Sequence, residues 1–240
     1  MKYLKYVREH FGDSSFPTFS IGDLRTALVQ RGIGDAYLKR LVNHMMKSGE
    51  ITRITRGEYT LHGDATVAGF AFRPFYYGLE DALRIRGLSM QGTNPIVMTT
   101  RNVRRGVRQF QGRNYVVYRI QRMHFFGYTL EPYMDFWIPV SDLEKTVIDM
   151  VYIGGGIRDE LWPGILKALD RKRLDEYLQR YEPWLKEKVH RLIRERSAKR
   201  GSKTGSSRLH KALPVLKRRA ARIRVKGDSA RIIRKYRDSR

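Results

Sequence analysis

Five carboxylates and one lysine in the middle of the sequence have the residue types of a metal-dependent nuclease: Glu131, Asp135, Asp142, Glu144, Asp149 and Lys145. Such a site uses carboxylates to hold a metal ion that activates water. Nucleases with a Glu-x-Lys pattern need the lysine two residues after the glutamate on one strand, whereas Glu144 and Lys145 are adjacent in a predicted helix. A helix cap explains Glu144, and a pair with Lys145, four residues earlier, explains Asp149. The pattern therefore predicts no enzyme.

Other catalytic or cofactor-binding patterns are weaker still. The six histidines are scattered and never stand four residues apart on one helix, so no metal site is predicted. The chain has no cysteine, which excludes disulfides and thiolate chemistry. Gly154-Gly155-Gly156 follows a helix and lacks a Gly-Lys-Ser/Thr ending, so it indicates a helix stop rather than a phosphate loop. We therefore expect no cofactor and no metal.

The net charge points to a polyanionic partner. The 240 residues carry a formal charge of +24, with a sequence pI of about 10.5. Residues 197–240 hold 16 of the 48 basic residues and only two acidic ones, so we interpret them as a basic, largely flexible tail. A membrane surface is the competing polyanion, but the tail has no Trp or Phe and the N-terminal residues form no continuous apolar run. Nucleic acid and a cytoplasmic location are the expectation, with no membrane contact.

A stripe of polar residues on a predicted helix could read DNA. Residues 35–48 place Leu38, Leu41, Val42 and Met45 on one face. Asn and Arg side chains can pair bidentately with adenine and guanine in the major groove. A solvated polar face is the alternative for any amphipathic helix of a basic protein. The opposite face carries Tyr37, Lys39, Arg40, Asn43, His44 and Lys47.

The neighbouring elements would position this helix. Ser20 and Asp23 indicate the start of a shorter helix that stops at Gly32, and Asp35 can cap the next one. Together they form a helix-turn-helix candidate, preceded by a helix over residues 1–11. Two β-prone runs, Ile51–Ile54 and Tyr59–Leu61, then predict a hairpin whose tip is Gly57.

This order predicts a winged helix over residues 1–63. Arg53 and Arg56 would lie on its wing, where they can reach the DNA backbone or a minor groove. The alternative is a winged helix that makes only protein contacts.

The remainder of the chain predicts a mixed α+β domain over residues 70–196, after a boundary near Gly63 to Gly69. We expect a helix over residues 79–86, a strand over 96–100, and further strands in NYVVYRI and DFWIPV. SDLEKTVIDMVYI should be a helix with a capping box of Ser141 and Glu144, and a long helix should run over residues 172–196. The aromatic residues of FAFRPFYYG could stack on single-stranded bases, but such density is more typical of a core.

Several of these segments resemble one protein family. YYGLEDALRIRGLSMQ, NPIVMTT and above all PVSDLEKTVIDM are similar to the second domain of AbiEi-type antitoxins of abortive-infection, type IV toxin–antitoxin systems. KSGEITRITRGEYTL resembles the wing of the same family. The resemblance covers about residues 1–180 and depends on the order of dispersed motifs.

This resemblance implies a winged-helix autorepressor that binds repeats in its own promoter, with double-stranded DNA as ligand. It also implies a second domain linked to antitoxin activity against a nucleotidyltransferase-type toxin. The DNA-contacting role would be carried by Tyr37, Lys39, Arg40, Asn43, Lys47, Arg53 and Arg56. The basic tail departs from the family pattern, so a stand-alone regulator stays open. The alternative function is an adaptor that binds DNA or RNA non-specifically through its tail. The oligomeric state is not predicted.

Overall fold

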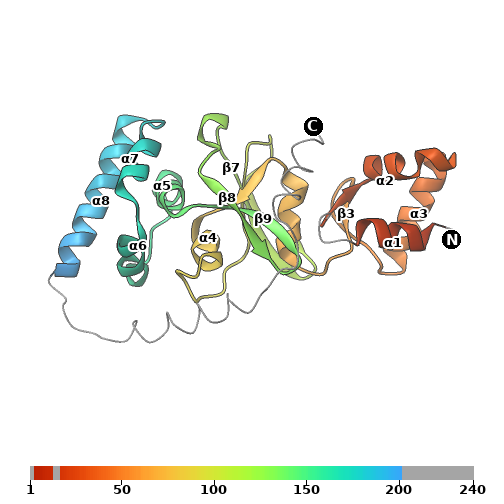
Figure 1. The fold of residues 1–240 in the computed structure, drawn as a ribbon, viewed down its shortest axis with the longest axis horizontal. Coiled ribbons are helices and arrows are strands. Elements are labelled where there is room, and N and C mark those ends of the chain that lie inside the picture. The colour runs from red at the N-terminus through yellow and green to blue at the C-terminus, as the bar shows by residue number, and fades with distance from the viewer. Residues whose placement is uncertain (1–2, 13–16, 202–240) are drawn as a thin grey trace. The chain divides into compact units, whose positions relative to one another are not determined.

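The N-terminal part of the structure alternates short helices with a small sheet (Figure 1). The computed structural model describes residues 3–12 and 17–201. The three strands pair antiparallel in the order β1-β3-β2. In chain order, the elements are α1 (Leu4–Phe11), β1 (Phe19–Ser20), α2 (Ile21–Leu28), the 3₁₀ helix η1 (Val29–Arg31), α3 (Asp35–Lys47), β2 (Thr52–Thr55) and β3 (Glu58–Thr60).

Local signals set the ends of α2 and α3. Ser20 Oγ accepts from the Asp23 amide at 3.1 Å, and the Asp23 carboxylate accepts from the Ser20 amide at 2.7 Å, so the predicted capping box is confirmed. Gly32 has a φ of 63°, which favours glycine at the stop. The prediction that Asp35 caps α3 is wrong, because Gly34 is the N-cap and Asp35 is the first helical residue.

One apolar cluster holds these elements together. The predicted stripe of α3 is buried, and Leu24 and Leu28 of α2 join it. Ile51 and Tyr59 carry the β2–β3 hairpin onto the same cluster. A two-stranded hairpin is marginal by itself in water, so these two contacts are what stabilise it against the helices.

A six-stranded mixed sheet follows, in the order β6-β7-β5-β4-β9-β8. The pairs β5·β7 and β4·β9 are parallel, and the other neighbours are antiparallel. Three of these strands, β4, β6 and β8, were not predicted from the sequence. The strands are β4 (Phe75–Tyr77), β5 (Ile96–Thr99), β6 (Gly106–Phe110), β7 (Arg113–Arg119), β8 (Tyr128–Tyr133) and β9 (Phe136–Ser141).

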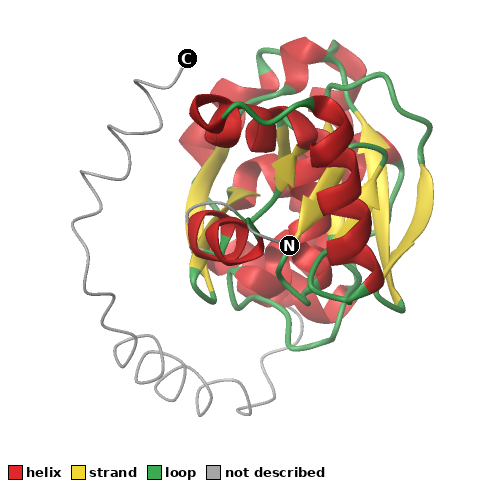
Figure 2. Ribbon diagram, turned by 90° about the vertical axis from the view of Figure 1, so that its right-hand side faces the viewer, coloured by secondary structure: helices red, strands yellow, loops and turns green. Residues whose placement is uncertain are grey.

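Helices cover one face of this sheet and a 3₁₀ helix covers the other. Alternate residues such as Tyr76 and Met98 belong to one apolar cluster with the helices between residues 143 and 201, whereas Tyr77 and Val97 belong to a second cluster with η2 (Ala65–Phe72). Phe70, Phe72 and Phe75 are buried in this second layer, so base stacking by that cluster is excluded. The protein is therefore α+β, as predicted, and Figure 2 shows its helices and strands by colour.

The helices of the second half depart from the sequence expectation in two places. The first is the predicted helix over 172–196, which is two helices, because the chain turns after Leu178 and Pro183 begins a new one. The second is the capping box at the start of α5. The helices are α4 (Leu79–Ile85), α5 (Leu143–Ile153), α6 (Trp162–Ala168), α7 (Arg171–Leu178) and α8 (Pro183–Gly201), with short 3₁₀ turns η3 (Arg122–His124) and η4 (Asp159–Leu161).

The Ser141–Glu144 capping box is wrong because Ser141 is the last residue of β9. Asp142 is the N-cap of α5 and accepts from the Lys145 amide at 2.8 Å. The Ser141 hydroxyl instead bonds Thr146 Oγ1 at 2.7 Å, and Glu144 accepts from the Asp170 amide at 2.7 Å. Glu144 therefore joins α5 to the start of α7.

The structure shows no exposed linker at the predicted domain boundary. The 3₁₀ helix Ala65–Phe72, which overlaps the boundary expected near Gly63 to Gly69, is buried throughout, and Met1–Ala198 form one compact unit. The division into 1–63 and 70–196 stays a prediction from sequence pattern. Of the predicted tail over 197–240, residues 197–201 belong to α8 and the rest lies outside the described residues. Among the helices that the structure describes, none is both long and apolar enough to cross a membrane.

Candidate nucleic-acid interface

The outward face of α3 is the first part of the candidate interface. Lys39, Arg40, Asn43, His44 and Lys47 are all exposed, on the side of the helix opposite its buried stripe. The spacing of three or four residues puts them along a single surface about three turns long. The structure therefore brings these five predicted residues together.

The side chains of Arg40, Asn43 and Lys47 are available to a ligand. In the range 3–12 and 17–201, no hydrogen bond or ion pair engages any of the three. The acidic residues nearby are occupied by other cations: Asp35 accepts two bonds of 2.9 Å from Arg25, and that guanidinium lowers the pKa of Asp35. Asp35 also interacts with the charge of Lys39, and Glu50 with His44. Arg40, Asn43 and Lys47 are therefore the members of the stripe that have no partner among the described residues.

Tyr37 differs from the rest of the stripe. Its ring is half-buried and meets Tyr3 edge-on, with 5.8 Å between ring centroids. The ring belongs to the edge of the N-terminal core. The Tyr37 ring thus has a packing role at the start of α1, where Tyr3 is the N-cap. Its contact with DNA stays a prediction.

The β2–β3 hairpin supplies the second part of the interface. Arg53 and Arg56 are exposed, and Gly57 has a φ of 86° at the turn, as predicted. Strand β2 also contacts the second half of the structure. Ile54 is buried in the apolar cluster between η2 and the six-stranded sheet, and Gln111 Nε2 donates to Thr52 Oγ1 at 3.0 Å. The hairpin therefore presents its two arginines from an anchored base.

The carboxylates considered for a nuclease are spread out and mostly engaged in structural contacts. Glu131 accepts from Arg86 at 3.0 Å, Asp142 caps α5, and Asp135 is exposed at the β8–β9 turn. Among the described residues, no three His, Asp or Glu side chains are grouped so as to hold a metal ion. That the chain is not an enzyme stays a prediction.

Asp149 and Lys145 form a pair, as the spacing predicts, but the pair is buried. The two side chains are 1% and 0% exposed. Tyr76 Oη donates to Asp149 Oδ2 at 2.7 Å, and Lys145 Nζ lies over the Tyr76 and Phe126 rings at 5.4 and 5.2 Å from their centroids. Burial raises the pKa of Asp149 and lowers the pKa of Lys145. The cluster is inaccessible to a substrate, and its contacts hold α5 against the sheet.

Acidification below about pH 6.5 is expected to destabilise the protein through His124. Its ring stacks on Tyr181 at 4.1 Å, and burial, followed by the nearby Lys145 charge, lowers its pKa. A lowered folded-state pKa means that the unfolded chain binds the proton more readily, so the stabilising contribution is present above the unfolded pKa and is lost as pH falls. Thermal unfolding from pH 7.5 to 5 should show His124→Phe with a weaker pH dependence than wild type. The exposed His44→Gln variant is the control, and equal slopes for all three proteins would contradict this role.

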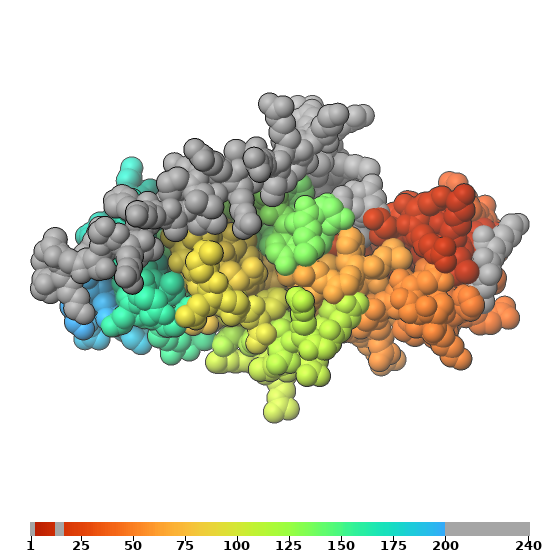
Figure 3. All heavy atoms as spheres, turned by 90° about the horizontal axis from the view of Figure 1, so that it is seen from below, coloured from red at the N-terminus to blue at the C-terminus, as the bar shows by residue number. Residues whose placement is uncertain are grey.

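The sequence also contains an arginine-rich segment that was not predicted to be a binding site. Residues 82–130 hold nine arginines, no lysine and no acidic residue. Two of them are internal clamps, because Arg84 binds Asp81 and Arg86 binds Glu131. The part of the chain around residues 100–122, yellow-green in Figure 3, stands on the surface in that view. The absence of carboxylates over 49 residues is the signal that could have found it. The exposed arginines are Arg101, Arg104, Arg105, Arg113, Arg119 and Arg122.

Comparison with known proteins gives a likeness of fold. No protein-family model matches the sequence, and no curated protein matches it significantly. Among solved structures, the fold is similar to the crystal structure of the Rv2827c protein from Mycobacterium tuberculosis, with a TM-score of 0.51 and 13% identity. The match covers 75% of this chain and 72% of that one. At this identity the likeness concerns the fold alone.

Proposed function

We propose that this protein is a sequence-specific, DNA-binding transcriptional regulator whose residues 1–63 form a winged helix. The carrying observation is that Arg40, Asn43 and Lys47 are exposed on α3 without a partner in the described part of the chain, and that the following hairpin exposes Arg53 and Arg56. The order α1, β1, α2, α3, β2, β3, with three antiparallel strands, supports a winged helix. In this proposal α3 is the recognition helix and β2–β3 is the wing.

The chemistry of each part fits a different role at a duplex. Asn43 and Arg40 are the side chains able to pair bidentately with adenine and guanine edges. Lys39 and Lys47 supply point charges for phosphates, and Arg53 and Arg56 can contact the backbone from the wing. Charge then provides affinity for any sequence, and the helix contacts provide the choice among sequences.

Binding to the protein's own upstream DNA tests this proposal. The full chain and residues 1–201 are compared on that duplex and on a scrambled duplex by fluorescence anisotropy across a salt series. Because counterion release weakens non-specific binding steeply, the preference for upstream DNA should persist as salt rises. If neither protein prefers the upstream duplex, and removal of residues 202–240 abolishes all binding, the proposal is wrong. The alternative function, an adaptor that binds nucleic acid non-specifically through its tail, would then remain.

We further propose that the regulator is the antitoxin and autorepressor of a type IV toxin–antitoxin system. The support is the resemblance of YYGLEDALRIRGLSMQ, NPIVMTT and PVSDLEKTVIDM to AbiEi-type antitoxins. In the structure these segments build β4–α4, β5 and β9–α5, including the buried Tyr76–Asp149–Lys145 cluster. The motifs therefore describe the scaffold of the second domain, and they identify no surface for a toxin.

Co-expression tests the antitoxin role. If an adjacent reading frame encodes a nucleotidyltransferase-type toxin, its expression should arrest growth, and the full-length protein should restore growth. An Arg40→Ala/Asn43→Ala variant, impaired in repression, should still protect when both genes are driven by external promoters. Absence of protection by a stably expressed wild-type protein would remove the antitoxin role and leave the regulator.

A further inference from the structure

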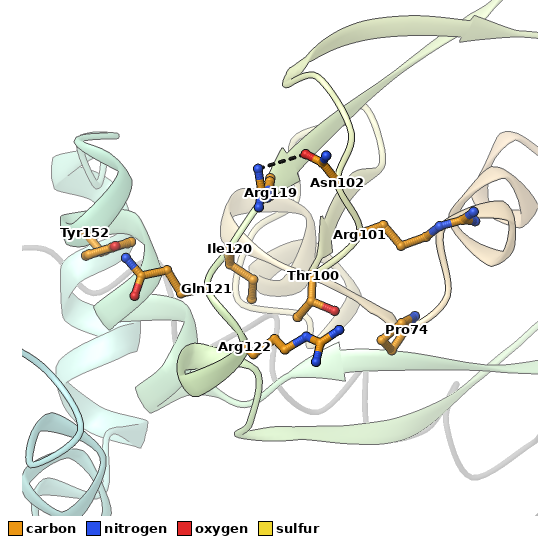
Figure 4. A pocket seen from close by; sticks show the side chains of 9 residues that line it. All are labelled: Pro74, Thr100, Arg101, Asn102, Arg119, Ile120, Gln121, Arg122 and Tyr152. Atoms are coloured by element: carbon orange, nitrogen blue, oxygen red, sulfur yellow. Dashed lines mark hydrogen bonds between the residues drawn. The ribbon is translucent and has the colours of Figure 1, made fainter.

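A polar cavity lies at the carboxyl ends of two parallel strands. β5 ends at Thr99 and its parallel neighbour β7 ends at Arg119, so the segments that follow both strands meet at the same edge of the sheet. The cavity has a volume of ≈ 770 Å³ and is lined by both segments (Figure 4). Ligands of open α/β sheets commonly bind outside the carboxyl ends of strands.

Two guanidinium groups dominate the lining. Arg119 Nη1 donates to Asn102 Oδ1 at 2.9 Å, which orients the group and leaves its other donors unused. Arg122 forms no hydrogen bond or ion pair with any residue in the described ranges, and Figure 4 shows it beside Thr100. A third arginine of the lining, Arg101, is engaged elsewhere, since its Nη1 donates to the Ala71 carbonyl at 2.7 Å.

The lining contains no carboxylate to neutralise these groups. Its other polar side chains are the hydroxyl of Thr100, the amides of Asn102 and Gln121, and the phenol of Tyr152. Each of the seven polar side chains of the lining, Arg101 included, carries at least one hydrogen-bond donor. Arginine, more than lysine, suits a planar, bidentate contact with phosphate oxygens. An anion with several oxygens is the ligand that this arrangement fits.

The surroundings indicate which anion. The cavity volume lies in the range of pockets for small organic ligands, which exceeds the need of an inorganic ion. The half-buried ring of Tyr152 forms part of the wall, where an aromatic ring can stack on a base. Arg105, which directly precedes the edge strand β6, adds a further cation on the neighbouring strand β7, where it lies over the Tyr118 ring.

We propose that this cavity is a nucleotide-binding site in which Arg119 and Arg122 bind the phosphates. The site lies on the six-stranded sheet, separate from the α3 stripe, and it does not depend on the proposed DNA readout. The shared chemistry is a nucleoside phosphate, supplied either as a free nucleotide or as part of a nucleic-acid strand.

The test uses the full-length protein and two probes. ATP binding is measured by calorimetry near physiological salt. A single-stranded oligonucleotide containing 4-thiothymidine is photo-crosslinked, and the modified peptides are located by mass spectrometry. For the double variant Arg119→Ala/Arg122→Ala we expect about tenfold or greater loss of ATP affinity, or a similar loss of crosslinks to peptides that line the cavity. The first result identifies a free nucleotide as ligand and the second a strand.

Three controls make the outcome decisive. Arg191→Ala/Arg194→Ala on α8 removes the same charge from exposed positions and should leave both signals near wild type. Arg119→Lys/Arg122→Lys keeps the charge but removes the forked donors, so its binding should lie between wild type and the double alanine variant. Unfolding temperatures check that each variant folds. Unchanged signals in the Arg119→Ala/Arg122→Ala protein for both probes, or equal losses in the α8 control, would overturn the proposal.

The α3 stripe distinguishes this failure from failure of the proposed function. Arg40→Ala/Asn43→Ala should leave ATP binding and cavity crosslinks unchanged while it removes preference for upstream DNA. Loss of the cavity signals in this variant would instead show that they arise from the N-terminal module, and would also overturn the proposed site.

Discussion

Replacing Lys145 by alanine is expected to lower the free energy of unfolding by about 3–5 kcal/mol, because it leaves the Asp149 carboxylate buried without its cation. The Asp149 side chain is 1% exposed, so water cannot solvate its carboxylate once the lysine is removed. Tyr76 would remain its hydrogen-bond donor, at 2.7 Å. Urea unfolding monitored by circular dichroism measures the change.

Two further variants separate the buried pair from the loss of a lysine side chain. Lys167→Ala removes an exposed lysine from α6 and should change stability by less than about 0.5 kcal/mol. Lys145→Met/Asp149→Asn replaces both charges and keeps an acceptor for Tyr76, so it should cost less than Lys145→Ala alone. Comparable stability of the Lys145→Ala and Lys167→Ala proteins would show that the ion pair does not hold α5 to the sheet.

The pairing of Lys145 with Asp149 could be predicted from the sequence, but its burial could not. The spacing of four residues correctly predicted that Lys145 and Asp149 meet on one helix face. It could not show that this face is buried, because burial depends on β4 and on the α7–α8 region, which are distant in the chain. Local spacing identifies partners, whereas their environment depends on tertiary packing.

The boundaries that failed have similar causes. Ser141 has the right spacing to Glu144 for a cap, but β9 extends through it, so its hydroxyl faces Thr146 and the Tyr77 carbonyl. Edge strand β6 was missed because Val107 and Phe110, its apolar side chains, are separated by the polar pair Arg108-Gln109 and so lack the alternation typical of a strand. The predicted α3 stripe succeeded because four apolar residues at helical spacing left little choice of face.

The cavity arginines illustrate a different limit. Arg119 and Asn102 are 17 residues apart and meet only because β5 and β7 are parallel neighbours. Periodicity predicts each strand separately, but it does not predict which strands pair or in which direction. The acid-free run over 82–130 was visible in the sequence, and only the fold shows which of its arginines share a cavity.

Replacing Arg40 or Asn43 by alanine is expected to weaken binding to the protein's own upstream DNA by about 1–3 kcal/mol each, with little effect on scrambled DNA. Both side chains are exposed on α3 and have no partner in the described part of the chain, so their removal should leave the fold unchanged. Competition binding on the two duplexes measures the difference.

The wing provides the matched control for this last prediction. Arg56 is exposed at the hairpin turn, outside the helix, and a backbone contact there carries no sequence information. Arg56→Ala should therefore weaken binding to both duplexes alike and reduce the salt dependence by about one phosphate contact. Equal losses on upstream and scrambled DNA for Arg40→Ala and Asn43→Ala would mean that α3 contributes only charge. The assignment of base readout to this helix would then be wrong.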